Sequence, residues 1–215
     1  MPERFAIYYA PPLGSQLDAL ALTWLRRVDL EPLTVSARRY GFHATLKAPM
    51  ALKAGTTPKS LGDALAAYAK AGAPVVIGRM EARLIDGFVA LVPVAQSREL
   101  TDFAGHLVEA FEPYRAPLDA RERQRRLAAP LSDRQVRLLD KYGYPFVLEQ
   151  FLFHMTLTDR PPPSRAQSLL AEARNWFAPA LGTPLVLDRL ALFHEPSAGA
   201  GFVRGEDYPL KGGAA

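Results

Sequence analysis

The sequence predicts an α+β fold in which a two-lobed, pseudo-twofold duplication of antiparallel sheets with flanking helices surrounds a central groove. Three observations lead to this prediction. The pattern F-H-x-T-L occurs twice, at residues 42–46 and 153–157. Each copy is followed by the same order of expected elements, a helix and then two strands. The intervening segments alternate between two-residue and helical periodicity, as in a mixed domain.

Composition limits what kind of protein this is. Of the 215 residues, 49% are apolar and 22% are charged, which is typical of a globular protein. We expect a single two-lobed domain over residues 1–215. Because the chain has no cysteine, disulfides, thiolate catalysis and cysteine metal sites are excluded. The apolar run at residues 5–9 is too short for a signal peptide, and no run approaches the roughly 20 residues of a membrane helix, so we expect a cytoplasmic protein without membrane contact.

The first half of the chain is expected to begin with a strand at residues 4–10 that ends at two prolines. A capping box at Ser15 precedes apolar residues at helical spacing and predicts a helix. A polar link then leads into the first histidine strand, which ends near Pro49. A second helix is expected over residues 57–70, since a proline is favoured at the first helical position.

Two strands and a helix complete this half. A strand is expected at residues 73–78, and residues 83–94 are expected to be its hairpin partner, with Asp86 and Gly87 as a turn or bulge. From Ser97 the apolar residues follow the spacing of an amphipathic helix.

The amino-acid composition changes at the start of the second half. Residues 113–145 are charged and flanked by prolines, and they predict a helical insertion that contains the basic run 121–126 and a capping box at Ser132. After the second histidine strand, a capping box at Ser164 predicts another helix. The last expected elements are strands at residues 185–193 and 202–210, joined by a glycine-rich turn.

The two copies of the repeated pattern carry the candidate catalytic residues. Side chains alternate across a strand, so a histidine and the threonine two residues later project from the same face. His43 and Thr45 therefore share one face, and His154 and Thr156 share another. An axis that relates the copies would bring the two imidazoles together as a general acid and base, since an unperturbed histidine has a pKa of about 6.5. The threonine hydroxyls would hold an anionic group between them.

This pairing suits the cleavage of a phosphodiester, in which one histidine activates water and the other protonates the leaving alkoxide. The motifs H-A-T-L at residues 43–46 and H-M-T-L at residues 154–157 resemble those of the two-histidine phosphoesterase superfamily. Residues 39–49 and 142–158 are most similar to a branch associated with phosphonate-utilisation gene clusters. The resemblance implies metal-independent hydrolysis of a cyclic phosphate, such as a nucleotide 2′,3′-cyclic phosphate or a ribose cyclic phosphate, and no cofactor.

Further residues are candidates for substrate binding. Lys47 is expected on the same face as His43 and Thr45, and Tyr40 and Arg39 lie just before this strand. Tyr8 projects from its strand opposite to its apolar neighbours and is a candidate for stacking on a base or sugar. The sequence does not distinguish which histidine is the base and which is the acid, because the two copies are chemically alike.

Two alternatives accompany this hypothesis. A metal site at His43 and His154 is disfavoured because a catalytic zinc needs about three protein ligands and no further ligand motif is present. An RNA-binding or regulatory module would retain the fold and use the basic run 121–126. The formal charge of +4 and the pI of about 9.4 favour an anionic partner, either a phosphorylated small molecule or a nucleotide or RNA end. No obligatory protein partner is indicated.

Overall fold

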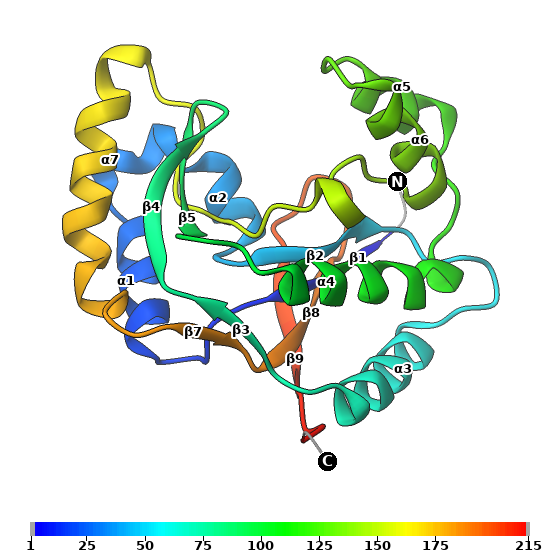
Figure 1. Ribbon diagram of the computed structural model, residues 1–215. Coiled ribbons are helices and arrows are strands. Elements are labelled where there is room, and N and C mark those ends of the chain that lie inside the picture. Colours follow the sequence, from blue (N-terminus) through cyan, green and yellow to red (C-terminus); the bar gives the residue numbers. More distant parts are fainter. Residues whose placement is uncertain (1–2, 214–215) are drawn as a thin grey trace.

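The computed structural model describes residues 3–213, which form a seven-stranded sheet, a two-stranded sheet and helices on their flanks (Figure 1). The larger sheet has the order β4-β5-β6-β2-β1-β8-β9, and all its neighbours are antiparallel. Its strands are β1 (Arg4–Tyr9), β2 (Ala44–Met50), β4 (Met80–Ile85), β5 (Phe88–Pro93), β6 (Met155–Thr156), β8 (Arg189–Glu195) and β9 (Val203–Pro209). The smaller sheet pairs β3 (Val75–Gly78) with β7 (Leu185–Leu187).

The helices interleave with the strands in a repeated order. They are α1 (Gln16–Leu25), α2 (Val35–Tyr40), α3 (Pro58–Ala71), α4 (Arg98–Ala110), α5 (Ala120–Leu127), α6 (Asp133–Tyr142) and α7 (Pro163–Phe177). Apart from α2, which precedes β2, and α5 and α6, which precede β6, the order β1-α1-β2-α3-β3-β4 recurs as β5-α4-β6-α7-β7-β8, and β9 follows the second copy. In the larger sheet the central pair β2 and β6, then β1 and β5, then β8 and β4 lie symmetrically about the middle. The predicted α+β class with antiparallel sheets and flanking helices is confirmed.

Most helix starts follow from local hydrogen bonding. The side chains of Ser15, Thr57, Ser97 and Ser132 each accept a hydrogen bond from the backbone N–H three residues later. The capping box predicted at Ser132 is confirmed, whereas at Ser15 only the serine half forms, because Asp18 accepts from Gly14 instead. The capping box predicted at Ser164 is wrong. Helix α7 already begins at Pro163, since a proline at the first helical position has no N–H to leave unsatisfied, and Ser164 lies inside the helix.

Strand β3 pairs with β7 and not, as predicted, with residues 83–94. Strand β4 instead forms a hairpin with β5 that turns at Asp86 and Gly87, where a turn or bulge was predicted. Both residues have positive φ, 47° and 87°, which is the backbone of the tight turn that suits the twist of an antiparallel pair. Asp and Gly tolerate this conformation better than other residues do.

The second histidine segment differs from the regular strand that was predicted. Only Met155 and Thr156 form β6, although Phe153, Met155 and Leu157 are all fully buried as the alternation required. Before β6, the side chain of Gln96 makes the backbone hydrogen bonds that a neighbouring strand would otherwise make. Its oxygen accepts from the backbone N–H of Phe153 at 2.7 Å, and its nitrogen donates to the carbonyl of Phe151 at 3.0 Å.

Two further expectations need correction. Residues 35–40 form α2 where a polar link was expected, and a 3-10 helix (Val28–Leu33) leads into it. The strand predicted at residues 185–193 is divided at Asp188 into β7 and β8, which belong to different sheets. Within residues 3–213, none of the helices has the length and apolar character to cross a bilayer.

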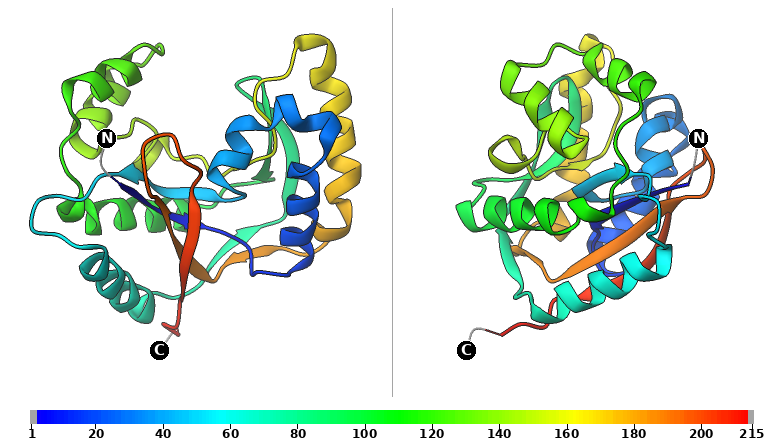
Figure 2. Two further views of the ribbon diagram at one scale, coloured as in Figure 1. Left: turned by 180° about the vertical axis from the view of Figure 1, so that it is seen from behind. Right: turned by 90° about the vertical axis from the view of Figure 1, so that its right-hand side faces the viewer.

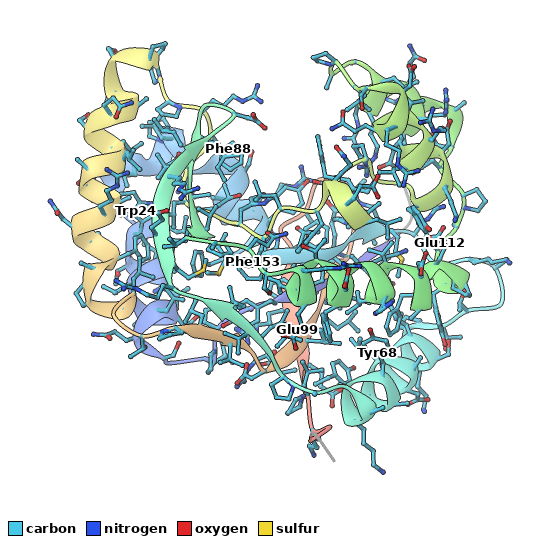
Figure 3. The ribbon with its side chains drawn as sticks, in the orientation of Figure 1. Trp24, Tyr68, Phe88, Glu99, Glu112 and Phe153 are labelled. Carbon is cyan, nitrogen blue, oxygen red and sulfur yellow. The ribbon has the colours of Figure 1, made fainter. Side chains whose placement is uncertain are left out.

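The core continues from one half of the fold into the other. Trp24 of α1 is fully buried against Trp176 and Phe177 of α7, and its indole N–H donates to the carbonyl of Leu157 at 3.0 Å. Phe153 lies between the two flanks of the molecule (Figure 3). These contacts hold the second histidine segment in place from the core side.

Above the central strands the molecule has two arms. Helices α5 and α6 form one arm, and the β4–β5 hairpin with α2 and α7 forms the other, as the views from the front and from behind agree (Figures 1 and 2). Strand β2 runs between the bases of the arms. A cavity lined by residues of α2 and α5 includes His43, Thr45 and Thr156 of the two repeated motifs.

Candidate active site

The register of the two central strands brings the four motif side chains together. Ala44 of β2 pairs with Met155 of β6, and both side chains are buried, with exposures of 1% and 0%. The residues on either side of this pair therefore project from the opposite face. In an antiparallel pair, position 43 then lies across from 156, and 45 lies across from 154. This register directs each histidine toward the threonine of the other motif, and Thr156 lines the same cavity as His43 and Thr45.

Local hydrogen bonds fix the first imidazole. The Nδ1 atom of His43 donates to the carbonyl of Gly41 at 2.9 Å, and Nε2 lies 3.1 Å from the hydroxyl of Thr45. With the ring proton on Nδ1, Nε2 is the basic nitrogen and accepts from Thr45. Gly41 has a φ of 74°, which turns its carbonyl toward the ring.

Tyr8 supports the same ring from behind. The two rings are stacked with their centroids 3.7 Å apart and their planes inclined by 19°. Tyr8 has only 1% of its surface exposed, so it cannot stack on a base or sugar as predicted while this arrangement holds. Its position instead orients His43.

The second imidazole is held in the same way. The Nδ1 atom of His154 donates to the carbonyl of Leu152 at 2.8 Å, and the ring lies 5.8 Å from the ring of Phe88 between centroids. Each histidine thus donates to the carbonyl two residues earlier, and each keeps Nε2 for chemistry. Both rings therefore have the same tautomer, with the proton on Nδ1, as the pseudo-twofold relation predicts.

Burial changes the acidity of both imidazoles. It lowers the pKa of His43 to about 4, against the opposing hydrogen bond to Gly41, and the nearby charge of His154 lowers it further. Burial also lowers the pKa of His154, although the hydrogen bond to Leu152 and the charge of Asp86 oppose this change. The lower pKa of His43 makes it the better candidate for the neutral base.

A cavity of about 370 Å³ lies over three of the motif residues. His43, Thr45 and Thr156 line it, whereas His154 is not part of the lining. Tyr40 also lines the cavity, as the sequence predicted, and its ring stacks on Phe202 at a centroid distance of 5.0 Å. The remaining wall comes from α2, β1, β2 and the inserted helices, through Arg4, Tyr8, Ser36, Ala37, Gly41, Ala48, Pro49, Arg125, Arg126 and Tyr144.

The prediction that Lys47 lies beside His43 and Thr45 is wrong. Tyr8 pairs with Thr45 but Ile7 pairs with Lys47, so two residues of β2 stand against one of β1. This bulge breaks the alternation and turns Lys47 to the other face. There its ammonium group donates to the carbonyl of Val108 at 2.9 Å and to Glu112 at 2.6 Å, near the end of α4 (Figure 3).

Arg39 does not line the cavity either. Its guanidinium contacts Glu195 at 2.5 Å and donates to the carbonyl of Ala200 at 3.2 Å, so it anchors the loop before β9. Three arginines that line the cavity were not predicted as single site residues. Arg4 belongs to the first strand, and Arg125 and Arg126 belong to the basic run 121–126, which was the signal in the sequence.

The basic run does not form one continuous surface. Arg123 pairs with Asp140 of α6 at 2.6 Å, away from Arg125 and Arg126. The RNA-binding alternative requires the arginines of residues 121–126 to act as one surface. In the structure Arg123 contacts α6, whereas Arg125 and Arg126 line the cavity. Among residues 3–213, no group of three or more His, Cys, Asp or Glu side chains is arranged to hold a metal ion.

Comparison with known proteins gives several similarities. The pattern of a family described as "Protein of unknown function (DUF1045)" matches residues 45–203. A protein named ribose 1,5-bisphosphate phosphokinase PhnN, from Janthinobacterium sp. (strain Marseille), is 32% identical over 231 aligned residues, which cover 97% of this chain and 51% of the relative. The chain spans about half the length of the curated relatives it matches.

Two solved structures resemble the whole chain. E. coli LigT complexed with NADP+ is 15% identical, with a TM-score of 0.48 and coverage of 97% of this chain and 98% of that one. TT0787 of Thermus thermophilus is also 15% identical, with a TM-score of 0.51 and the same coverage, and this likeness concerns the fold. Since the family pattern covers well over half of the sequence, the chain belongs to the DUF1045 family, with the fold that the resemblance to two-histidine phosphoesterases implied.

Proposed function

We propose that this protein hydrolyses a cyclic phosphodiester, with His43 and His154 as the acid and base and with no metal ion. The observation that carries the proposal is the crossed arrangement on β2 and β6, in which each histidine lies across from the threonine of the other motif. The register directs two imidazoles and two hydroxyls to the same face of the sheet. This is the set of groups that in-line displacement at phosphorus needs.

The reaction follows from the protonation states. His43, held neutral by its low pKa, takes a proton from water through Nε2 as the water oxygen attacks phosphorus. The bond from phosphorus to one ring oxygen breaks, and His154 gives its proton to that alkoxide. When the substrate is bound, the Thr45 hydroxyl turns its single proton from Nε2 of His43 to a non-bridging oxygen, which leaves Nε2 free for the water. Thr156 donates to the other non-bridging oxygen, and both hydrogen bonds stabilise the negative charge that accumulates there. The product is a phosphate monoester, and one proton has moved from His154 to the leaving oxygen while His43 has gained one.

The substrate class we favour is a ribose cyclic phosphate. Two relatives that are 32% and 34% identical to this chain over about half of their own length are named ribose 1,5-bisphosphate phosphokinases. Opening a 1,2-cyclic phosphate on ribose at the bond to O2 leaves the phosphate on O1, which is the position that their name includes. A role in phosphonate metabolism, expected from the resemblance, is part of this proposal.

A direct test is to follow turnover by phosphorus NMR. Purified protein treated with EDTA should convert ribose 1,2-cyclic phosphate or a nucleoside 2′,3′-cyclic phosphate to a monoester at the rate of the untreated protein. Activity that disappears with EDTA and returns with a divalent cation would contradict the metal-free mechanism. Absence of turnover on every cyclic phosphate in the panel would contradict the activity itself.

The pH dependence provides a second test. The pKa of His43 is about 4, and that of His154 is lowered from 6.5, so free protein with neutral His43 and protonated His154 is most abundant between these values. We expect kcat/KM to be greatest on the acidic side of neutrality, above pH 4 and below pH 6.5. A profile of initial rates across buffers of constant ionic strength measures this. An optimum above pH 7 would contradict the assignment.

A further inference from the structure

Helix α5 of the insertion brings two arginines to the cavity that holds His43. Arg125 and Arg126 both line this cavity, together with Arg4 of β1. The proposed hydrolysis does not use any of them. Their charge therefore needs another explanation.

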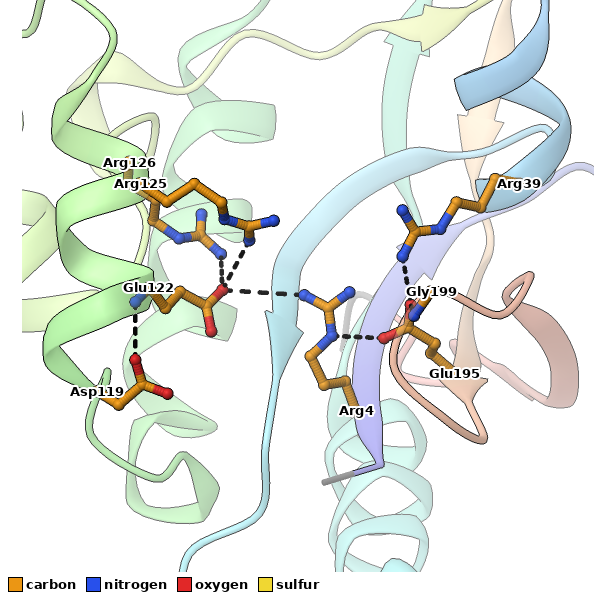
Figure 4. A network of polar contacts seen from close by, with 8 residues as sticks. All are labelled: Arg4, Arg39, Asp119, Glu122, Arg125, Arg126, Glu195 and Gly199. Atoms are coloured by element: carbon orange, nitrogen blue, oxygen red, sulfur yellow. Dashed lines mark hydrogen bonds and ion pairs between the residues drawn. The ribbon is translucent and has the colours of Figure 1, made fainter. Parts of the chain in front are cut away.

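These three cations share one carboxylate. Oxygen Oε1 of Glu122 lies 3.0 Å from Nη2 of Arg126, 3.3 Å from Nη2 of Arg125 and 3.9 Å from Nη1 of Arg4 (Figure 4). One negative charge cannot balance three positive ones. The groups converge on the same point although they come from β1 and from the insertion, far apart in the sequence.

The neighbouring carboxylate does not remove the imbalance. Glu195 contacts Arg4 at 2.6 Å but also contacts Arg39 at 2.5 Å on its other side. Four guanidinium groups thus contact two carboxylates, which leaves two positive charges unbalanced. A partly buried cluster with this excess favours an additional anion.

Arg126 is also short of hydrogen-bond acceptors. Its side chain is 16% exposed and lies between Glu122 and the ring of Tyr144, with the guanidinium carbon 5.7 Å from the ring centroid. Its Nε atom is buried and has no partner among residues 3–213. The buried Nε does not face the cavity, but a guanidinium carries further N–H donors on its two Nη atoms, of which Nη2 donates to Glu122. An oxyanion in the cavity would accept from the remaining Nη donors.

The insertion is built to keep this orientation. Asp119 caps α5 by accepting from the backbone N–H of Glu122 at 2.7 Å, and Arg123 fastens α5 to α6 through Asp140 at 2.6 Å. The contact of Arg123 is therefore directed to α6, while Arg125 and Arg126 are directed to the cavity. Along α5, the basic run therefore both attaches the helix to α6, through Arg123, and lines the cavity, through Arg125 and Arg126.

We propose that Arg125 and Arg126, with Arg4, bind a second phosphate group of the substrate, one that is not cleaved. This inference rests on the proposed function and names its substrate class: a ribose that carries a phosphate monoester in addition to the cyclic phosphate. A monoester has a charge of about −1.5 to −2 at pH 7, which matches the two unbalanced positive charges. The same cavity of about 370 Å³ includes both the arginines and His43, so both phosphates belong to one molecule.

The test compares two substrates that differ only in the second phosphate. Ribose 1,2-cyclic phosphate and its 5-phosphorylated form are assayed with wild type and with Arg125→Gln/Arg126→Gln. Two charge-assisted hydrogen bonds of about 1.5 kcal/mol each predict that wild type prefers the phosphorylated substrate by about 100-fold in kcat/KM. The preference should fall below about 10-fold in the double variant. Arg121→Gln removes one positive charge from α5 outside the cavity and should keep the full preference.

Binding of ribose 5-phosphate provides a readout that needs no turnover. By calorimetry it should bind wild type and Arg121→Gln alike and bind the double variant at least about 10-fold more weakly. The inference is overturned if wild type does not discriminate between the two substrates, or if the double variant keeps the preference and the affinity. If neither cyclic phosphate is hydrolysed, the proposed activity fails, and the binding result alone then decides whether the arginines hold a phosphate.

Discussion

Replacing either catalytic histidine should reduce hydrolysis of a cyclic phosphate by about 10²–10⁴-fold in kcat/KM. His43→Ala removes the base, and His154→Ala removes the acid, so neither variant can complete the proton transfers. Because the two act in one concerted step, we expect the double variant to lose little more than either single variant. Initial rates at the pH optimum measure the loss, and far-UV circular dichroism and thermal melts show whether the fold is intact.

A matched control separates catalysis from general damage. His106 lies exposed on α4, outside the cavity, and His106→Ala removes an imidazole without touching either motif. Its rates should equal those of wild type. If His43→Ala or His154→Ala hydrolyses the substrate at the rate of this control, the histidine pair is not the acid and base.

The two variants should also differ in a way that identifies their roles. With His43 as the base, the acidic limb of the pH profile belongs to this ring, and its low pKa places that limb near pH 4. The residual activity of His43→Ala should lose this limb. The residual activity of His154→Ala should keep the acidic limb but should no longer decrease as the pH rises toward alkaline values. The opposite result would exchange the roles.

The shared face of histidine and threonine in each motif could be predicted from the sequence because it depends on local periodicity. A two-residue alternation places a histidine and a threonine on one face whichever strand lies beside them. The alternation held even where the regular strand did not, since Gln96 provides the missing hydrogen bonds to Phe151 and Phe153. What the motif requires is an extended backbone, and a side chain can provide that as well as a strand.

The same rule failed at Lys47, only two residues beyond Thr45. The bulge opposite Ile7 arises from how β1 and β2 pair, and a single sequence does not contain that information. The cavity arginines illustrate a related limit. Arg4 and Arg126 both contact Glu122 because the insertion folds back over β1. The basic run can be recognised in the sequence, but the sequence does not show which of its arginines point toward the cavity.

Glu195 should be one of the most sensitive positions for stability. It is fully buried in β8 and accepts from Arg4 and Arg39, and the backbone N–H of Gly199 donates to it at 3.1 Å. Burial raises its pKa, but the hydrogen bonds from the two arginines outweigh burial and leave the pKa below its usual value. The carboxylate is thus ionised and connects β1, α2 and the loop before β9.

Glu195→Ala should cost about 3–5 kcal/mol in the free energy of unfolding, because it leaves two guanidinium groups without their shared acceptor. For a chain of this size that lowers Tm by on the order of 10 °C. Glu31→Ala is the control: its partner is Arg38 at 3.1 Å, but the side chain is 63% exposed, and we expect a loss below about 1 kcal/mol. Urea unfolding of both variants measures the difference. Equal losses would mean that Glu195 contributes no more than a surface ion pair, and that Arg4 is held at the cavity by other contacts.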